Sequence, residues 1–344
     1  MRTLKVAGIL FVAAVATLFA LLWIEHRTEV TLPAPTGQFA VGRALFDWRD
    51  DRGTRELLGW MWYPADARSG TLDDYVPAAV RQPPNHGLFA LLTRDLSKVH
   101  GHSLRDARVS PHHRSFPVLI LRGGASAPVM NYSTLAEDLA SHGYMVVGFD
   151  AAYRTSVVVF PDGRIVRRTP QNNPELGADI NRLLREWTAD IGFVLDTLAK
   201  MNDARFAGRL DLTRVGVFGH SFGGSQALQF CHDDPRCKAG VDIDGIPLGS
   251  VVETGLDKPF MFLLSDHSGD ADRAEVMPKI ESIYNRLPAN SRALVTIPHA
   301  NHFTFSDDGA LLKSFVFRAI LRVDGRRQLA LTAQDLRGFF DAHL

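Results

Sequence analysis

The chain has 344 residues, of which 46% are hydrophobic and 22% charged, enough to bury a sizeable core in one large domain. Its 38 Lys and Arg residues are balanced by 38 Asp and Glu, so the formal net charge is zero. Such a chain has no net field that would gather phosphate backbones, which excludes nucleic acid as an expected partner.

Residues 1–30 differ from the rest of the chain. Arg2 and Lys5 precede an uncharged run, Val6–Ile24. A helix of this length, rising about 1.5 Å per residue, just spans a bilayer core of about 30 Å. We expect a membrane anchor through residues 6–24, with its basic end in the cytoplasm and the following domain outside. The alternative is a signal peptide cleaved near Ala14-Val15-Ala16, which would release a secreted protein.

Residues 31–344 are expected to form one domain that opens with a hairpin. The segment Gly37–Tyr63 mixes alternating apolar residues with the turn Asp50–Gly53, a pattern typical of two antiparallel strands. Residues 65–115 are rich in Pro, Gly, His and Arg and lack apolar periodicity. We therefore expect an irregular surface excursion there, with one short helix near Leu88–Leu96.

The same excursion contains scattered histidines: His100, His102, His112 and His113. A metal site built from them is an alternative hypothesis. Histidines on a polar loop are usually solvated, and no carboxylate lies at helical ligand spacing from them. We expect no metal and no organic cofactor.

From Phe116 onward, strands and helices alternate. Continuous apolar runs at Pro117–Leu121, Tyr144–Phe149 and Arg214–Phe218 suit parallel strands that are buried on both faces. The run Val157–Val166 is predicted to be a hairpin turned by Pro-Asp-Gly. Further strands are expected downstream: Gly240–Ile243, Pro259–Leu264 and Arg292–Ile297.

A long helix is predicted ahead of the strand at Arg214–Phe218. Asn173 can cap it and Pro174 fits its first turn. Apolar residues at helical spacing form one stripe that predicts a core-facing side. The stripe consists of Ile180, Leu183, Leu184, Trp187, Ile191, Val194, Leu195 and Leu198.

The motif Gly219-His220-Ser221-Phe222-Gly223-Gly224 carries the chemistry. It follows an apolar strand and precedes a helix-forming run, Ser225–Phe230, which is the context of the nucleophile elbow in α/β-hydrolases. The glycines allow a sharp turn that exposes the Ser221 hydroxyl. The amide of Phe222, at the start of the helix, can face a developing oxyanion. His220 should point to the opposite side of the strand and pack there.

The serine needs a general base, and in this fold the acid and then the histidine follow the nucleophile. His299 and His302 both follow the last predicted strand, and spacing alone does not separate them. Three other histidines also follow Ser221: His232, His267 and His343.

The candidate acids lie at the ends of two predicted strands. Asp242 and Asp244 end one strand and should lie on the same side of it, whereas Asp266 and Asp270 follow the next. Asp244 precedes Gly245, so a loop can carry it toward a histidine more easily than Asp242, which lies inside the strand.

The second oxyanion donor should come from the loop Arg122–Ala125. This loop occupies the position of the Gly-rich oxyanion loop of esterases, and Gly124 is the candidate donor beside the Phe222 amide. The two cysteines, Cys231 and Cys237, are separated by a turn that contains Pro, and an exported domain would allow them to form a disulfide.

Together these segments resemble the plasma platelet-activating-factor acetylhydrolase family and its bacterial relatives among the α/β-hydrolases. The resemblance spans roughly residues 37–307. Besides the elbow, it rests on four segments: Trp62-Tyr63-Pro64, Phe116–Ile120, Tyr132-Ser133 and Leu139–Tyr144.

The resemblance implies an α/β-hydrolase fold, with a mostly parallel sheet and helices on both faces. It implies Asp244, rather than Asp266, as the triad acid. It also implies a histidine followed by Phe three positions later and by Asp five positions later, a pattern that His302, Phe305 and Asp307 fit and His299 does not.

We therefore expect a serine-dependent carboxylic ester hydrolase with the triad Ser221, Asp244 and His302, acting on a small-molecule or lipid ester. The alternative is a catalytically silent α/β-hydrolase domain that binds a lipid or a protein partner.

Overall fold

The computed structural model describes residues 2–81, 94–173, 179–201, 206, 208–266, 273–311 and 324–344. Its strands are β1 (Val30–Thr31), β2 (Ala40–Arg49), β3 (Glu56–Ala65), β4 (Thr71–Asp74), β5 (Val99–Arg105), β6 (Phe116–Arg122), β7 (Met145–Ala151), β8 (Val157–Val159), β9 (Ile165–Arg167), β10 (Leu210–His220), β11 (Cys237–Ile243), β12 (Phe260–Leu264) and β13 (Arg292–Thr296). Its α-helices are α1 (Arg2–Arg27), α2 (Ser133–Ser141), α3 (Ile180–Lys200), α4 (Phe222–Asp233), α5 (Val251–Thr254), α6 (Arg273–Arg286), α7 (Asp307–Leu311) and α9 (Gly325–His343). Short 3-10 helices are η1 (Ala78–Val80), η3 (Leu96–Lys98), η4 (Val129–Tyr132), η5 (Pro170–Asn172) and η7 (His302–Phe305).

One large sheet organises the domain, with its strands in the order β1-β5-β2-β3-β7-β6-β10-β11-β12-β13 and with β4 added to β5. The strands from β7 through β6 and β10 to β13 are all parallel, whereas β3 is antiparallel to both neighbours. Since parallel strands end at the same edge, the loops after β6, β10, β11 and β13 meet there. This mostly parallel sheet confirms the predicted fold class.

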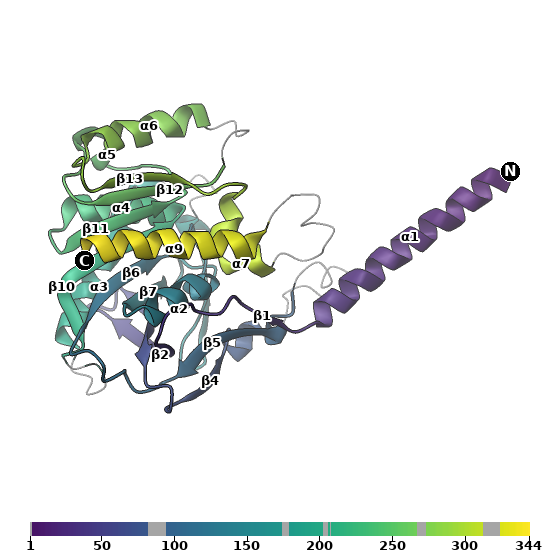
Figure 1. Ribbon diagram of the computed structural model, residues 1–344, viewed down its shortest axis with the longest axis horizontal. Coiled ribbons are helices and arrows are strands. Elements are labelled where there is room, and N and C mark those ends of the chain that lie inside the picture. Colours follow the sequence, from purple (N-terminus) through teal and green to yellow (C-terminus); the bar gives the residue numbers. More distant parts are fainter. Residues whose placement is uncertain are drawn as a thin grey trace.

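Helices cover both faces of the sheet. Figure 1 shows α2 and α9 lying across one face. Residues of α2 and α9 pack in one buried cluster with strand residues such as Leu119 and Val241. Residues of α3, α4 and α6 pack in a second cluster with strand residues such as Val118 and Val217. Each central strand therefore buries both of its side-chain rows, which explains why its sequence is continuously apolar.

The predicted hairpins are present. β2 pairs antiparallel with β3, from Ala40 opposite Ala65 to Arg49 opposite Glu56. β8 pairs antiparallel with β9.

The expectation of an irregular excursion at 65–115 is wrong for part of its length, because the segment contributes β4 and β5 to the main sheet. In β5 the buried positions include Gly101 and Ser103, small residues that give no apolar signal. Most of the predicted helix near Leu88–Leu96 lies outside the described residues.

The long amphipathic helix begins later than predicted. Asp179, not Asn173, caps α3, and its carboxylate accepts hydrogen bonds from the N–H groups of Asn181 and Arg182. Pro174 lies outside the described residues. The predicted apolar stripe is buried from Leu183 onward, so the core-facing side of the helix is confirmed.

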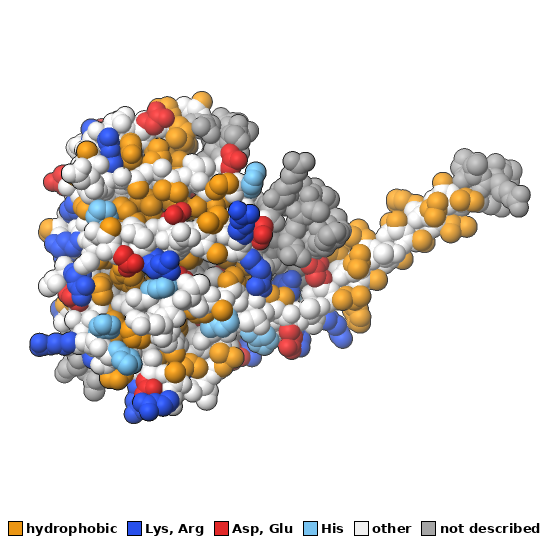
Figure 2. Space-filling view, viewed as in Figure 1, with side chains coloured by type: hydrophobic (Ala, Val, Ile, Leu, Met, Phe, Trp, Pro, Cys, Tyr) orange, Lys and Arg blue, Asp and Glu red, His pale blue; other side chains and the backbone are white. Residues whose placement is uncertain are grey.

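The N-terminal helix α1 projects from the domain (Figure 1) and carries hydrophobic side chains along its length (Figure 2). Phe11, for example, is 70% exposed. Val6–Arg27 is long and apolar enough to cross a membrane, and a cleaved signal sequence has the same character.

Candidate active site

Ser221 lies at a sharp turn between β10 and α4. Its backbone has φ +56° and ψ −125°, a conformation that non-glycine residues rarely adopt and that marks a functional turn. The turn needs glycine at both flanks. A Cβ on Gly219 would lie 2.3 Å from the carbonyl oxygen of Gly223, and a Cβ on Gly223 would lie 2.5 Å from that of Arg122. The Ser221 N–H donates to the carbonyl oxygen of Ile243 at 2.8 Å, which fixes the turn against β11.

The helix α4 starts directly at the turn. The N–H groups of Gly224 and Ser225 donate to the Ser221 carbonyl. Within the described part of the chain, the Phe222 N–H has no acceptor, as expected for the first residue of a helix. An amide in this position, at the positive end of the helix dipole, suits a negatively charged oxygen.

The structure brings Asp244 and His302 together. Asp244 Oδ2 lies 2.7 Å from His302 Nδ1. The carboxylate is also held from the other side, because the Ser265 N–H donates to Oδ1 at 2.8 Å and the Ser265 hydroxyl donates to Oδ2 at 3.0 Å. The Asp244 side chain is fully buried, whereas that of His302 is 41% exposed. A buried, oriented carboxylate therefore faces an imidazole that reaches solvent.

The competing histidine and acid are placed differently. His299 is exposed, with φ +58°, and Asp266 is exposed and uses its backbone N–H to hold the Ala300 carbonyl. Asp270 and His267 lie outside the described residues.

Asp242 is buried below the elbow. Its Oδ1 accepts the Gly245 N–H at 2.9 Å, and its Oδ2 has no hydrogen-bond partner among the described residues. Burial, and the neighbouring charge of Asp244, raise the pKa of Asp242 to about 8.

His220 differs from the expectation that it only packs on the far side of its strand. It is buried, but its ring lies 4.4 Å from the ring of His302. Burial and the charge of His302 lower the pKa of His220 to about 3, so the ring remains neutral near pH 7. The reason for the difference is that His302 comes from η7, an element far along the chain that folds back over the end of β10.

Gly124 lies beside the nucleophile as predicted, but its amide already has a partner. A Cβ on Gly124 would lie 3.3 Å from the Cβ of Ser221. The Gly124 N–H donates to the Tyr132 hydroxyl at 3.0 Å. Its use as an oxyanion donor therefore requires sharing or exchanging this hydrogen bond.

An apolar wall lies next to the elbow. It is formed by Leu183, Leu184, Trp187 and Phe222, and the rings of Trp187 and Phe222 meet edge to face at 5.1 Å. Ala125 of the oxyanion loop packs against the same wall. All four side chains are buried, so the wall packs behind the start of α4 and supports the turn that carries Ser221.

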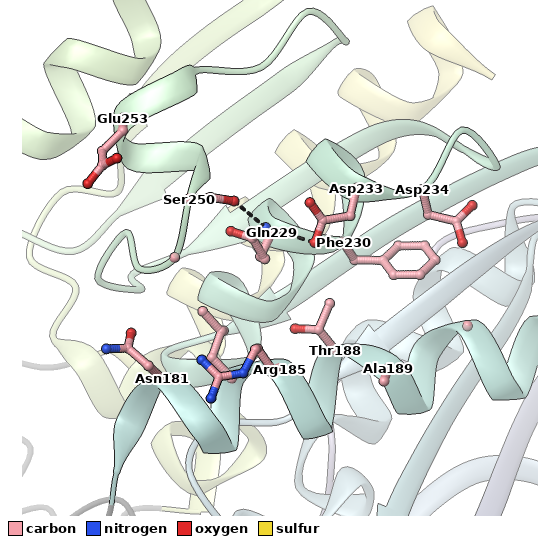
Figure 3. Close-up of a pocket in the computed structure, with 13 residues that line it drawn as sticks. Asn181, Arg185, Thr188, Ala189, Gln229, Phe230, Asp233, Asp234, Ser250 and Glu253 are labelled. Carbon is pink, nitrogen blue, oxygen red and sulfur yellow. Dashed lines mark hydrogen bonds between the residues drawn. The ribbon is translucent and has the colours of Figure 1, made fainter.

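A separate groove of about 780 Å³ lies between α3, α4 and the segment before α5 (Figure 3). It shares Leu184 with the apolar wall, but its sides carry polar and charged groups such as Arg185, Gln229 and Glu253. Ser221 is not among its lining residues. The groove is therefore distinct from the site around the elbow.

Cys231 and Cys237 form a disulfide, as predicted. It joins the last part of α4 to the first residue of β11. Both cysteines are buried. The bond therefore fixes the crossover between the strand that precedes Ser221 and the strand that precedes Asp244.

Three residues near the site had no role in the sequence prediction: Ser265, Tyr132 and Trp187. Tyr132 belongs to a segment that carries the family resemblance, and Trp187 belongs to the apolar stripe. Neither pattern indicates what the side chain will contact, because the Phe222 ring that meets Trp187 and the His220 ring that meets Tyr132 come from another part of the chain.

Comparison with known proteins identifies relatives over most of the chain. Residues 191–335 match the family model described as platelet-activating factor acetylhydrolase, isoform II. A probable 1-alkyl-2-acetylglycerophosphocholine esterase of Arthroderma benhamiae is 26% identical, covering 84% of this chain and 79% of that protein. The platelet-activating factor acetylhydrolase of Bos taurus is 23% identical over 96% of this chain and 81% of its own length. The chain is platelet-activating-factor acetylhydrolase-like.

The acetylhydrolase-like chain also has a similar solved structure. A ferulic acid esterase from Streptomyces cinnamoneus superposes with a TM-score of 0.77 at 27% identity, covering 91% of this chain and 93% of the esterase. The relatives and this structure carry the names of ester-cleaving enzymes. They confirm the prediction of an ester-hydrolysing enzyme.

Proposed function

We propose that this enzyme cleaves carboxylic esters with Ser221 as nucleophile, His302 as general base and Asp244 as the group that orients the imidazole. The single observation that carries the proposal is the 2.7 Å contact between Asp244 Oδ2 and His302 Nδ1. An Asp that holds Nδ1 leaves Nε2 available to take a proton from a serine hydroxyl, and it stabilises the imidazolium that forms.

The steps follow from these roles. The Ser221 oxygen attacks the acyl carbon while its proton passes to His302, and the carbonyl oxygen becomes an oxyanion. The amides of Phe222 and Gly124 are the proposed donors to that oxyanion. His302 then gives its proton to the departing alcohol oxygen, and the acyl-enzyme is hydrolysed by a water molecule that His302 deprotonates in turn.

The finer substrate proposal is an acyl or lipid ester presented near a membrane. The relatives named above act, by their names, on acetylated glycerophospholipids and on platelet-activating factor, and the neighbouring structure is a ferulic acid esterase. Residues 6–24 would hold the enzyme in the membrane, with its catalytic domain outside the cytoplasm.

The test replaces Ser221 with Ala. We expect Ser221→Ala to lose at least about 10³-fold in kcat toward nitrophenyl acetate and to lose labelling by a fluorophosphonate probe, with the fold intact. Ser291→Ala serves as the matched control. This serine directly precedes β13, so it lies where the parallel strands begin, whereas Ser221 lies where they end.

Turnover by Ser221→Ala at the wild-type rate would contradict the triad. A wild-type protein that neither labels nor turns over esters would instead support a silent binding domain. A series of esters of increasing acyl length then defines the substrate class.

A further inference from the structure

Tyr132 lies behind the proposed site, at the end of η4, and is 2% exposed. Its hydroxyl oxygen accepts the Gly124 N–H at 3.0 Å and lies 2.9 Å from His220 Nδ1. One buried hydroxyl thus joins the oxyanion loop after β6 to the last residue of β10, immediately before Ser221.

The proton arrangement of this contact is self-consistent. A hydroxyl that accepts the Gly124 N–H can donate its own proton to His220 Nδ1, which leaves the remaining ring proton on Nε2. The low pKa of His220 agrees with a neutral ring that accepts such a hydrogen bond.

The chain of contacts continues into the proposed triad. The His220 and His302 rings lie 4.4 Å apart with an interplanar angle of 40°. His220, Asp244 and His302 lie close together: one ring nitrogen or carboxylate oxygen of each residue is within 4.8 Å of such an atom in the other two. Because His220 is neutral, it can support the His302 ring without repelling the imidazolium that forms during the reaction.

The oxyanion loop packs directly against Tyr132. A Cβ on Gly123 would lie 3.2 Å from Tyr132 Cε2, and a Cβ on Gly124 would lie 3.4 Å from the Tyr132 hydroxyl oxygen and 3.5 Å from His220 Nδ1. The Gly123 position is closed to a side chain, since its Cβ would also lie 2.8 Å from the Ala127 carbonyl oxygen, whereas a Cβ on Gly124 would be in ordinary contact with the tyrosine.

We propose that Tyr132 is a positioning residue for ester hydrolysis. Its hydroxyl fixes the direction of the Gly124 amide and, through His220, supports the ring of His302. An amide N–H can be shared between two acceptors, so the Tyr132 oxygen and a developing oxyanion can use the same donor. This inference rests on the proposed function of Ser221, His302 and Asp244.

The first experiment compares Tyr132→Phe with wild type. Without the hydroxyl, the Gly124 amide loses its fixed direction, so we expect kcat to fall about 10- to 100-fold while KM stays within about twofold. The inhibition constant of phenylboronic acid, which forms a tetrahedral adduct with serine, should rise in parallel with the loss of kcat. A residue that only stabilises the fold would not produce this parallel change.

The matched control is Tyr144→Phe. Tyr144 is also a buried tyrosine, and its hydroxyl donates to Asp341 at 2.6 Å, on the face of the sheet covered by α9. We expect the kcat of this variant and its inhibition constant for phenylboronic acid to stay within about twofold of wild type. Rates are expressed per serine labelled by the fluorophosphonate probe, so that unfolded protein does not contribute.

A double-mutant cycle keeps the test decisive if Tyr132→Phe is destabilised. If Tyr132 acts through His220, the double variant Tyr132→Phe/His220→Asn should lose no more kcat than the more impaired single variant. Additive losses would overturn the part of the proposal that acts through His220, and unchanged kcat in Tyr132→Phe would overturn the proposal as a whole. A raised kcat would also overturn it, because Tyr132 would then compete with the oxyanion. If Ser221→Ala retains activity, it is the proposed function that fails.

Discussion

Asp242 and Asp244 are two residues apart, yet they have different environments. Strand alternation predicts that they lie on the same side, but Asp244 follows the last residue of β11 and has φ +53°. This backbone conformation turns its carboxylate toward His302, whereas Asp242 remains under the elbow beside Gly245. A Cβ on Gly224 would lie 1.8 Å from Asp242 Oδ1, so glycine at 224 makes room for that carboxylate.

The role of Asp244 is tested by Asp244→Asn. The amide cannot stabilise the imidazolium of His302, so we expect kcat to fall about 10³- to 10⁴-fold with little change in melting temperature. Steady-state kinetics and thermal melting measure both effects. Asp266→Asn is the control and should keep kcat within about twofold; equal losses in the two variants would refute the assignment.

Asp242 makes stability depend on pH. Its pKa is raised to about 8 in the folded protein, against about 3.9 in an unfolded chain. Between about pH 4 and 8 the unfolded chain has therefore released a proton that the folded chain retains, and the free energy of unfolding falls as pH rises.

Asp242→Asn should remove this dependence, because the amide resembles the protonated acid. We expect the melting temperature of the variant, relative to wild type, to increase from pH 5 to pH 9. Asp51→Asn, at an exposed turn, is the control. Differential scanning fluorimetry across this range measures the effect, and parallel curves for Asp242→Asn and wild type would show that the buried carboxyl does not titrate as described.

The segment η7–α7 connects the proposed base to the rest of the fold. Asp307, at the start of α7, accepts hydrogen bonds from the Tyr75 hydroxyl at 3.0 Å and from the Thr134 N–H at 3.2 Å. It thereby ties the segment that carries His302 to α2 and to the region after β4. The spacing of His302, Phe305 and Asp307 that carried the family resemblance thus has a structural reason at its acidic end.

The disulfide between α4 and β11 provides a second link between elements. Closing a loop with a sequence separation of 6 stabilises a protein by about 2 kcal/mol in the chain-entropy model. We expect protein prepared under reducing conditions, with free thiols, to melt about 3 °C lower than the oxidised protein.

The control for this comparison is Cys231→Ala/Cys237→Ala, whose melting temperature should not depend on the redox conditions of preparation. Thermal melting after thiol quantification measures the difference. Identical melting of oxidised and reduced wild type would mean that the bond adds no stability.

The helix α1 gives the protein an apolar extension outside its folded domain. Its side chains are largely exposed to solvent in the absence of a membrane, which favours burial in a bilayer. Arg326 near the start of α9 donates to the Thr31 carbonyl, so the chain just after α1 is held close to the segment that follows η7 and α7. The proposed anchor therefore enters the domain near the elements that carry His302.

Removal of residues 2–27 should separate anchoring from catalysis. We expect the truncated enzyme to stay in solution without detergent and to keep kcat toward a soluble nitrophenyl ester within about twofold, since no proposed catalytic residue lies in α1. Membrane fractionation and steady-state kinetics measure the two properties. If the protein expressed from the complete sequence is instead found entirely in the soluble fraction and begins at residue 17, the segment is a cleaved signal peptide.

Periodicity and local motifs were sufficient to predict the parallel strands, both hairpins, the core-facing side of α3 and the elbow, because each depends on residues close together in the chain. They were insufficient for β5, where buried glycine and serine give no apolar signal, and for the start of α3. Periodicity and local motifs also do not predict the contacts that define the site. Asp244 and His302 lie 58 positions apart, and Gly124 meets Tyr132 across a folded loop. Such contacts depend on how the elements pack. The family resemblance pointed to Asp244 and His302, but only the tertiary structure gives the contact between them and the partner of the Gly124 amide.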